Sequence, residues 1–109
     1  MEVSIDELKF LLTKEPQITE RDSWVNVGEN YFIRTVTHYY LGRVTRVTPY
    51  EIVLSDAAWI GDTGRFSDFL KNGRTDTMEV EPYLEPVAVS RAAVVDIARW
   101  THDLLTNQM

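Results

Sequence analysis

The segment 31–47 constrains the fold more than any other part of the chain, because it is dense in β-branched and aromatic residues. Such residues are enriched in strands. Its seventeen residues exceed the roughly five or six of an ordinary strand, so the strand must bend. Gly42 is the expected place of a sharp bend or of a close approach to a neighbour, since glycine inside a strand pattern marks such features. The segment therefore predicts a mainly β fold.

A hairpin is predicted directly after this segment. Residues 48–51 form a tight turn in which Pro49 presets the backbone angle. Residues 52–54 form the next strand, which is expected to end at 55–58. The remaining β pattern consists of strands expected at 78–81, 87–89 and 94–97, with a turn at 90–92.

An amphipathic helix is predicted within an N-terminal helical region at 1–22. Ser4 and Glu7 have the spacing of a capping box, in which each side chain binds the backbone N–H of the other residue. Pro16 ends the helical pattern. The apolar residues that recur at helical spacing are Ile5, Leu8, Leu11 and Leu12.

Residues 59–77 break the β pattern and are predicted to be an insertion between strands. Asp62 or Thr63 can cap a short helix over 64–71, and Gly73 suits the position after a helix end. The glycine-containing turn 61–65 could also hold an anion at the start of that helix. The capping interpretation is favoured, because Asp62 would repel a phosphate.

Length and charge set further limits. The 109 residues suffice for one domain. Seventeen acidic residues against eleven basic ones give a net charge of −6, which disfavours duplex DNA as a partner. The absence of cysteine excludes disulfides and thiolate metal sites and favours an intracellular protein. No apolar run approaches the roughly 20 residues that cross a bilayer, and acidic residues occupy the place of a signal peptide's basic region. We therefore expect a cytoplasmic protein without a membrane partner.

No pattern points to an enzyme, a cofactor or a metal site. His38 and His102 are the only histidines, and they lie far apart without the spacing of a ligand cluster. Glu79 and Glu81 would share one face of a strand, as paired catalytic carboxylates do, but a solvated strand face is the favoured interpretation. We expect a non-enzymatic protein with no catalytic residues.

Two degenerate motifs suggest a family. The first consists of Gly42, Val44 and Val47, followed by Leu-Ser-Asp-Ala at 54–57; the second is the strand, turn and strand of 87–97. In content and order these motifs resemble the Sm/LSm-like (Hfq-like) family of small β-barrels. The resemblance implies an N-terminal helix and a strongly bent, five-stranded antiparallel barrel, here with a helical insertion. It also implies a ring of identical subunits that pair through their edge strands.

The resemblance places a ligand surface at two turns. The family holds RNA through Asp and Asn in the turn between the second and third strands and through Arg-Gly in the last turn. Here Thr48 stands in place of the Asp, Ser90 in place of the Arg and Arg91 in place of the Gly. The expected ligand-binding residues are Thr48, Tyr50, Ser90 and Arg91, with a small nucleotide or single-stranded RNA as the ligand. The strand segment 31–56 carries three arginines against two acids, which suits a small anionic ligand.

A second hypothesis belongs to another functional class. The chain would be a structural or regulatory protein of a phage or other mobile element, and it would bind a protein partner through the insertion 59–77. Four residues of that insertion that look exposed or charged in the sequence would make the contact: Trp59, Arg65, Phe66 and Phe69.

Overall fold

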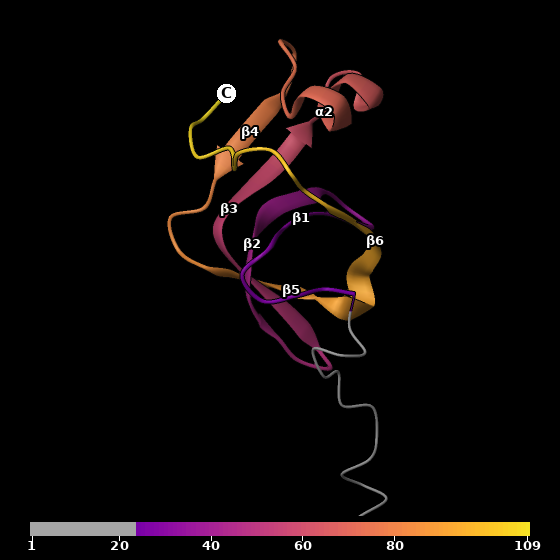
Figure 1. Cartoon of the computed structure of the whole chain (residues 1–109), viewed down its shortest axis with the longest axis vertical. Helices are drawn as coiled ribbons and strands as arrows, with labels where there is room; N and C mark the ends of the chain where they lie inside the picture. Colours follow the sequence, from indigo (N-terminus) through magenta and orange to yellow (C-terminus); the bar gives the residue numbers. More distant parts are fainter. Residues whose placement is uncertain (1–23) are drawn as a thin grey trace, which may run out of the picture.

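The computed structural model describes residues 24–109, which form six antiparallel strands and one α-helix (Figure 1). The mainly β class is confirmed, although the strands number six and not five. The expected helical region 1–22 lies outside the described residues. The elements are β1 (Asn30–Thr35), β2 (Tyr39–Val47), β3 (Glu51–Asp62), α2 (Phe66–Asn72), β4 (Glu79–Pro82), β5 (Val87–Ser90), the 3-10 helix η1 (Arg91–Ala93) and β6 (Val94–Arg99).

The strands form one curled sheet in the order β4-β3-β2-β1-β6, with β5 also pairing with β3. The twelve-residue β3 has room for two neighbours along one edge: β5 pairs with its first residues and β4 with its last. β5 and β6 lie at opposite ends of the path through the sheet, yet only η1 separates them in the chain. Three residues span at most about 10 Å, so the sheet must curl strongly. No ladder joins β5 to β6 within residues 24–109, so the sheet is not a closed barrel.

The expected long strand 31–47 is two strands, β1 and β2. Thr35 closes the turn between them, because its backbone N–H donates to the His38 carbonyl oxygen at 2.9 Å and its hydroxyl donates to the same oxygen at 2.6 Å. The His38 N–H donates back to the Thr35 hydroxyl at 3.2 Å. The sequence at 36–38 contains no glycine or proline, so the usual turn signal is missing there.

The close approach predicted at Gly42 is confirmed. The pairing of β2 with β3 shifts register between Leu41 and Arg43, and a Cβ on Gly42 would stand 3.0 Å from the Leu54 Cβ. The expected end of the next strand at 55–58 is wrong, because β3 continues to Asp62. Asp56 adopts a left-handed backbone with φ of 49° within β3, and its carboxylate pairs with Arg43 at 2.8 Å.

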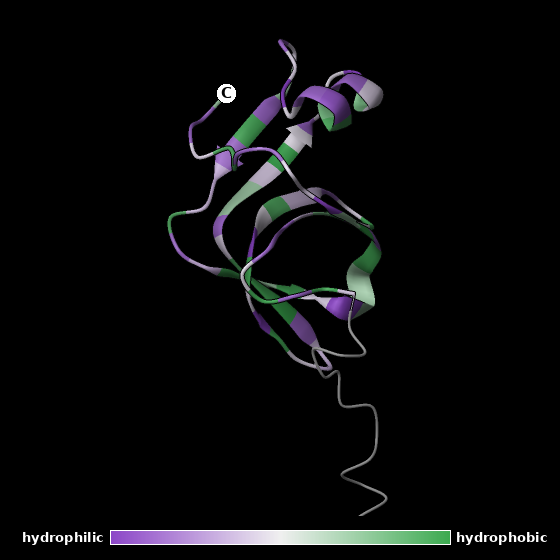
Figure 2. Ribbon diagram, viewed as in Figure 1, coloured by the Kyte–Doolittle hydropathy of each residue, from purple (hydrophilic) through white to green (hydrophobic). Residues whose placement is uncertain are grey.

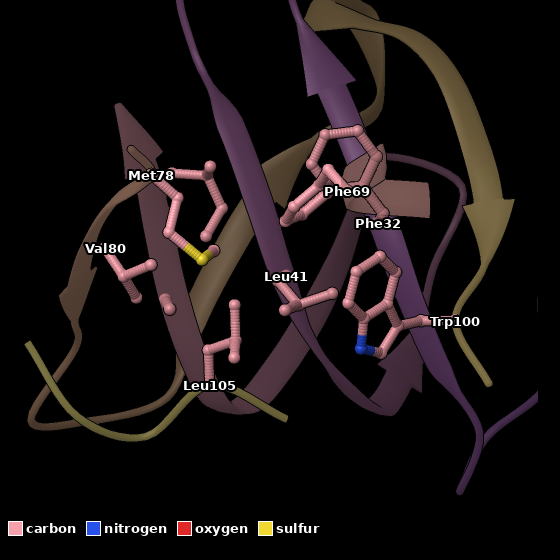
Figure 3. Packing of buried hydrophobic residues seen from close by; sticks show 9 residues of the cluster. Phe32, Leu41, Phe69, Met78, Val80, Trp100 and Leu105 are labelled. Atoms are coloured by element: carbon pink, nitrogen blue, oxygen red, sulfur yellow. The ribbon is translucent and has the colours of Figure 1, made fainter. Parts of the chain in front are cut away.

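Each face of the sheet carries a buried apolar cluster. Neighbouring residues of β1 contribute to different clusters, Phe32 to one and Tyr31 and Ile33 to the other, and successive strand residues point to opposite faces. Bands of hydrophobic and hydrophilic residues accordingly alternate along β3 and β4 (Figure 2). The first cluster packs α2 and the C-terminal segment against the sheet (Figure 3) and consists of Phe32, Leu41, Ala58, Ile60, Phe69, Met78, Val80, Trp100 and Leu105.

The second cluster fills the inside of the curled sheet. Its members come from β1, β2, β3 and β5, together with a residue that precedes β1. The buried residues of this cluster are Val25, Tyr31, Ile33, Val44, Ile52, Leu54, Ala57 and Val89. The part of the sheet that contributes these residues thus has its own apolar core.

The expected short helix and its end are confirmed, but its start is not. α2 ends at Gly73, which has the left-handed φ of 76° and whose N–H donates to the Phe69 carbonyl oxygen. Neither Asp62 nor Thr63 caps it: the N-cap is Arg65, and the Asp62 carboxylate instead accepts the Gly64 N–H at 2.8 Å. No helix among residues 24–109 combines the length and apolarity that crossing a membrane requires.

Candidate functional site

The two turns expected to bind a ligand lie side by side at one end of the sheet. Glu51 pairs with Ser90 in the ladder between β3 and β5, and the Arg91 N–H donates to the Tyr50 carbonyl oxygen at 2.9 Å. The structure therefore brings together the four expected residues, which include Thr48, although some forty residues separate the two turns in the sequence.

Thr48 uses its hydroxyl and its backbone N–H for hydrogen bonds within the turn that it begins. Its hydroxyl accepts the N–H of Glu51 at 3.0 Å and the N–H of Tyr50 at 3.2 Å, and its own N–H donates to the Glu51 carbonyl oxygen at 2.9 Å. Tyr50, in contrast, projects from the turn, and 83% of its surface is exposed. The tyrosine ring is therefore available for stacking, whereas the threonine shapes the turn.

Arg91 supplies a positive charge at this end of the sheet. Its Nη1 is buried and has no hydrogen-bond partner within the described part of the chain. A buried donor without an acceptor is costly, and a guanidinium pairs readily with a carboxylate or a phosphate. The Ser90 side chain is exposed beside it. We call Tyr50, Ser90 and Arg91 the loop site.

The four residues expected to bind a protein partner do not form one surface. Phe69 was expected to be exposed, but it is completely buried in the cluster under α2. Phe66 is 42% exposed, with its ring 6.0 Å from that of Phe32. Arg65 is exposed at the N-cap of α2. Trp59 belongs to β3, where its neighbour Ile60 faces Phe69, so Trp59 points to the opposite face.

Trp59 instead joins a cluster of aromatic side chains that the sequence did not reveal. The His38 ring lies 4.7 Å from that of Tyr40 and 6.0 Å from that of Trp59. Tyr40 is stacked on Tyr83, with centroids 6.0 Å apart and planes inclined by 23°. We call these four residues the aromatic face. The i, i+2 spacing of His38 and Tyr40 at the start of β2 signals part of it, but Tyr83 comes from the segment after β4 and carries no such signal.

Hydrogen bonds join the His38 ring to Thr37 and to Tyr40. The Thr37 hydroxyl lies 2.8 Å from Nδ1 of His38, and Nε2 of His38 lies 2.6 Å from the Tyr40 hydroxyl. Burial, with a hydrogen bond to Tyr40, raises the pKa of Tyr83 to about 12. The rings are thus held in fixed relative positions while their outer surfaces remain partly exposed.

The raised pKa of Tyr83 predicts a pH effect at the alkaline end. The folded chain favours the neutral phenol, so this group's contribution to stability is complete below its ordinary pKa of 10.0 and is lost as the pH rises through about 12. We expect the tyrosinate absorbance of the folded protein to show a step near pH 12 that is missing in Tyr83→Phe. A titration of that variant identical to the wild type would contradict the assignment.

Neither a metal-ligand cluster among the described residues nor a match to a known family identifies the role of these sites. No group of three or more His, Cys, Asp or Glu side chains within residues 24–109 is placed to hold a metal ion. No known family model matches the chain, and no curated protein matches it.

Proposed function

We propose that this chain is a non-enzymatic Sm-like protein that forms a ring with copies of itself and holds a small nucleotide or single-stranded RNA at the loop site. The observation that carries the proposal is the meeting of the half-buried Arg91 side chain and the exposed Tyr50 ring across the Arg91–Tyr50 backbone hydrogen bond. One arginine can pair with a phosphate, while a tyrosine ring can stack a base for about 1–3 kcal/mol.

The curl of the sheet supports the Sm-like part of the proposal. β1 pairs with both β2 and β6, and the short η1 returns the chain from β5 to β6. The result is a small bent sheet around its own apolar core, with the two ligand turns at one end (Figure 1). The resemblance implies a strongly bent sheet of this kind, and the observed curl supports the proposal in that respect.

Two open strand edges support the ring. Among the described residues, β5 pairs with β3 alone and β6 with β1 alone, so each has an outer edge that can pair with another chain. Val95 is exposed on β6, where it could contact a neighbouring subunit. The β4 edge is different, since Val80 exchanges two backbone hydrogen bonds with Met109 at 2.9 and 3.0 Å.

Arg91→Gln is the variant that tests the loop site. Hydrogen bonds to charged groups contribute about 1.5–3 kcal/mol, so we expect Arg91→Gln to weaken binding of fluorescent oligo-U or of a nucleotide about tenfold or more. Binding to the wild type should also fall as salt rises, because phosphate contacts release counterions. Fluorescence anisotropy at low and moderate salt measures both effects.

A matched variant separates this site from the general charge of the chain. Arg74→Gln removes the same charge from an exposed residue between α2 and β4, and it should leave the affinity unchanged. Equal losses in the two variants would contradict the loop site. Light scattering after size exclusion tests the ring separately, and a stable monomer would overturn that part of the proposal.

The surface of α2 favours a second candidate, a structural or regulatory protein that binds a protein partner through 59–77. Phe66 and Leu70 are 42% and 40% exposed, which leaves apolar surface for a contact. This candidate predicts that neither oligo-U nor nucleotides bind at any salt concentration.

A further inference from the structure

β4 and β5 pair with opposite ends of β3 (Figure 1). The aromatic face lies at the β4 end, because Trp59 pairs with Glu81 of β4, and the loop site lies at the β5 end. Tyr40 and Trp59 are directly paired across β2 and β3, so their side chains lie on the same face of the sheet. His38, Tyr40 and Trp59 are partly exposed, and Tyr83 is 36% exposed. Contiguous exposed aromatic surface on a folded chain marks interaction sites.

Carboxylates border this surface. Glu81 on β4 is paired with Trp59, so it lies on the aromatic face's side of the sheet. Glu79 is also close to the indole, because both side chains lie against Gly61. A Cβ placed on Gly61 would stand 3.0 Å from two carbons of the Trp59 ring and 3.1 Å from Oε2 of Glu79. Residues 79–86 contain three glutamates and no lysine or arginine, so the stretch that supplies Glu79 and Glu81 carries only negative charges.

We propose that the aromatic face and its glutamate border bind an arginine-containing segment of a protein partner. A guanidinium group is planar and cationic, so it can stack on tyrosine and tryptophan rings while its N–H groups pair with a carboxylate. One residue pair offers both an aromatic ring and a carboxylate, because Trp59 and Glu81 are opposite one another in the sheet. The adjacent Leu84 is fully exposed and offers an apolar contact to the same segment.

The charge of the border decides between this partner and nucleic acid. Single-stranded nucleic acids also stack on aromatic platforms, but their phosphates require a positively charged groove. Three glutamates in eight residues would repel a phosphate backbone and attract a cation. The proposal does not depend on the loop site, which lies at the other end of the sheet and has the opposite charge preference.

A labelled peptide tests the proposal directly. The probe is a short fluorescein-labelled peptide with three arginines separated by glycine and serine, and it is compared with peptides in which lysine or citrulline replaces each arginine. We expect the arginine peptide to bind, the lysine peptide to bind at least several-fold more weakly, and the neutral citrulline peptide not to bind. Equal binding of the arginine and lysine peptides would overturn the proposal, because attraction to a chain of net charge −6 needs no aromatic surface.

Variants at the surface locate the binding. Tyr83→Ala and Glu81→Gln should each weaken binding of the arginine peptide about five- to tenfold, whereas Tyr83→Phe, which retains the ring, should keep it. Tyr50→Ala is the matched control, because it removes an exposed tyrosine at the other end of the sheet. Wild-type affinity in both Tyr83→Ala and Glu81→Gln would overturn the proposal. If the wild type binds oligo-U and Tyr83→Ala abolishes that binding, the proposal is also overturned. Loss of oligo-U binding in Arg91→Gln alone concerns only the loop site.

Discussion

Phe69→Ala is expected to lower the free energy of unfolding by about 3–5 kcal/mol, the range typical of removing a large buried aromatic side chain. Phe69 is completely buried. Its ring packs edge-on against Phe32 at 5.2 Å and lies 4.8 Å from Trp100. One side chain therefore holds α2 and the start of the C-terminal segment against the sheet (Figure 3). Urea unfolding followed by circular dichroism and tryptophan fluorescence measures the loss.

Leu70→Ala provides the control within the same helix. Leu70 is 40% exposed, so its truncation should change the free energy of unfolding by under about 1 kcal/mol, as at most surface positions. Similar losses in the two variants would contradict the described orientation of α2. Because Phe69 supports the core, a test of partner binding through α2 should use Phe66 or Leu70.

The contrast between Phe69 and Leu70 shows that helical spacing predicts a helix but does not predict which of its apolar residues is buried. Phe66, Phe69 and Leu70 recur at helical spacing, and the short helix expected here is observed as α2. Which of the three enters the core depends on where the sheet lies beneath the helix, and that contact is not local. The same limit applies to the turn between β1 and β2, where a threonine side chain replaces the usual glycine or proline.

The two candidate surfaces also differ in how far the sequence predicts them. The two turns of the loop site were expected to share one ligand surface because the family resemblance implies it, and the pairing of Glu51 with Ser90 brings the two turns together. The aromatic face depends on the contact of Tyr40 with Tyr83. Tyr83 follows β4 in an irregular segment, so neither strand alternation nor helical spacing relates it to Tyr40.

Gly42→Val is expected to lower the free energy of unfolding by about 1–3 kcal/mol, the usual cost of overpacking a core. A Cβ at this position would already stand 3.0 Å from the Leu54 Cβ and 3.2 Å from the Ala57 Cα. Because Ala57 presents backbone, the neighbouring strand cannot yield by a change of rotamer. Valine is a better strand former than glycine, so propensity alone predicts a gain in stability.

The sign of the effect therefore decides between packing and propensity at this position. Gly42→Ala should show a smaller loss than Gly42→Val, since it adds the first carbon of the same clash. Thr45→Val tests propensity on the same strand at an exposed position, and it should leave the urea midpoint nearly unchanged. A midpoint that rises in Gly42→Val would mean that β2 and β3 are farther apart at the bulge than described. A fall confined to the Gly42 variants would tie the bend in β2 to direct contact between its backbone and that of β3.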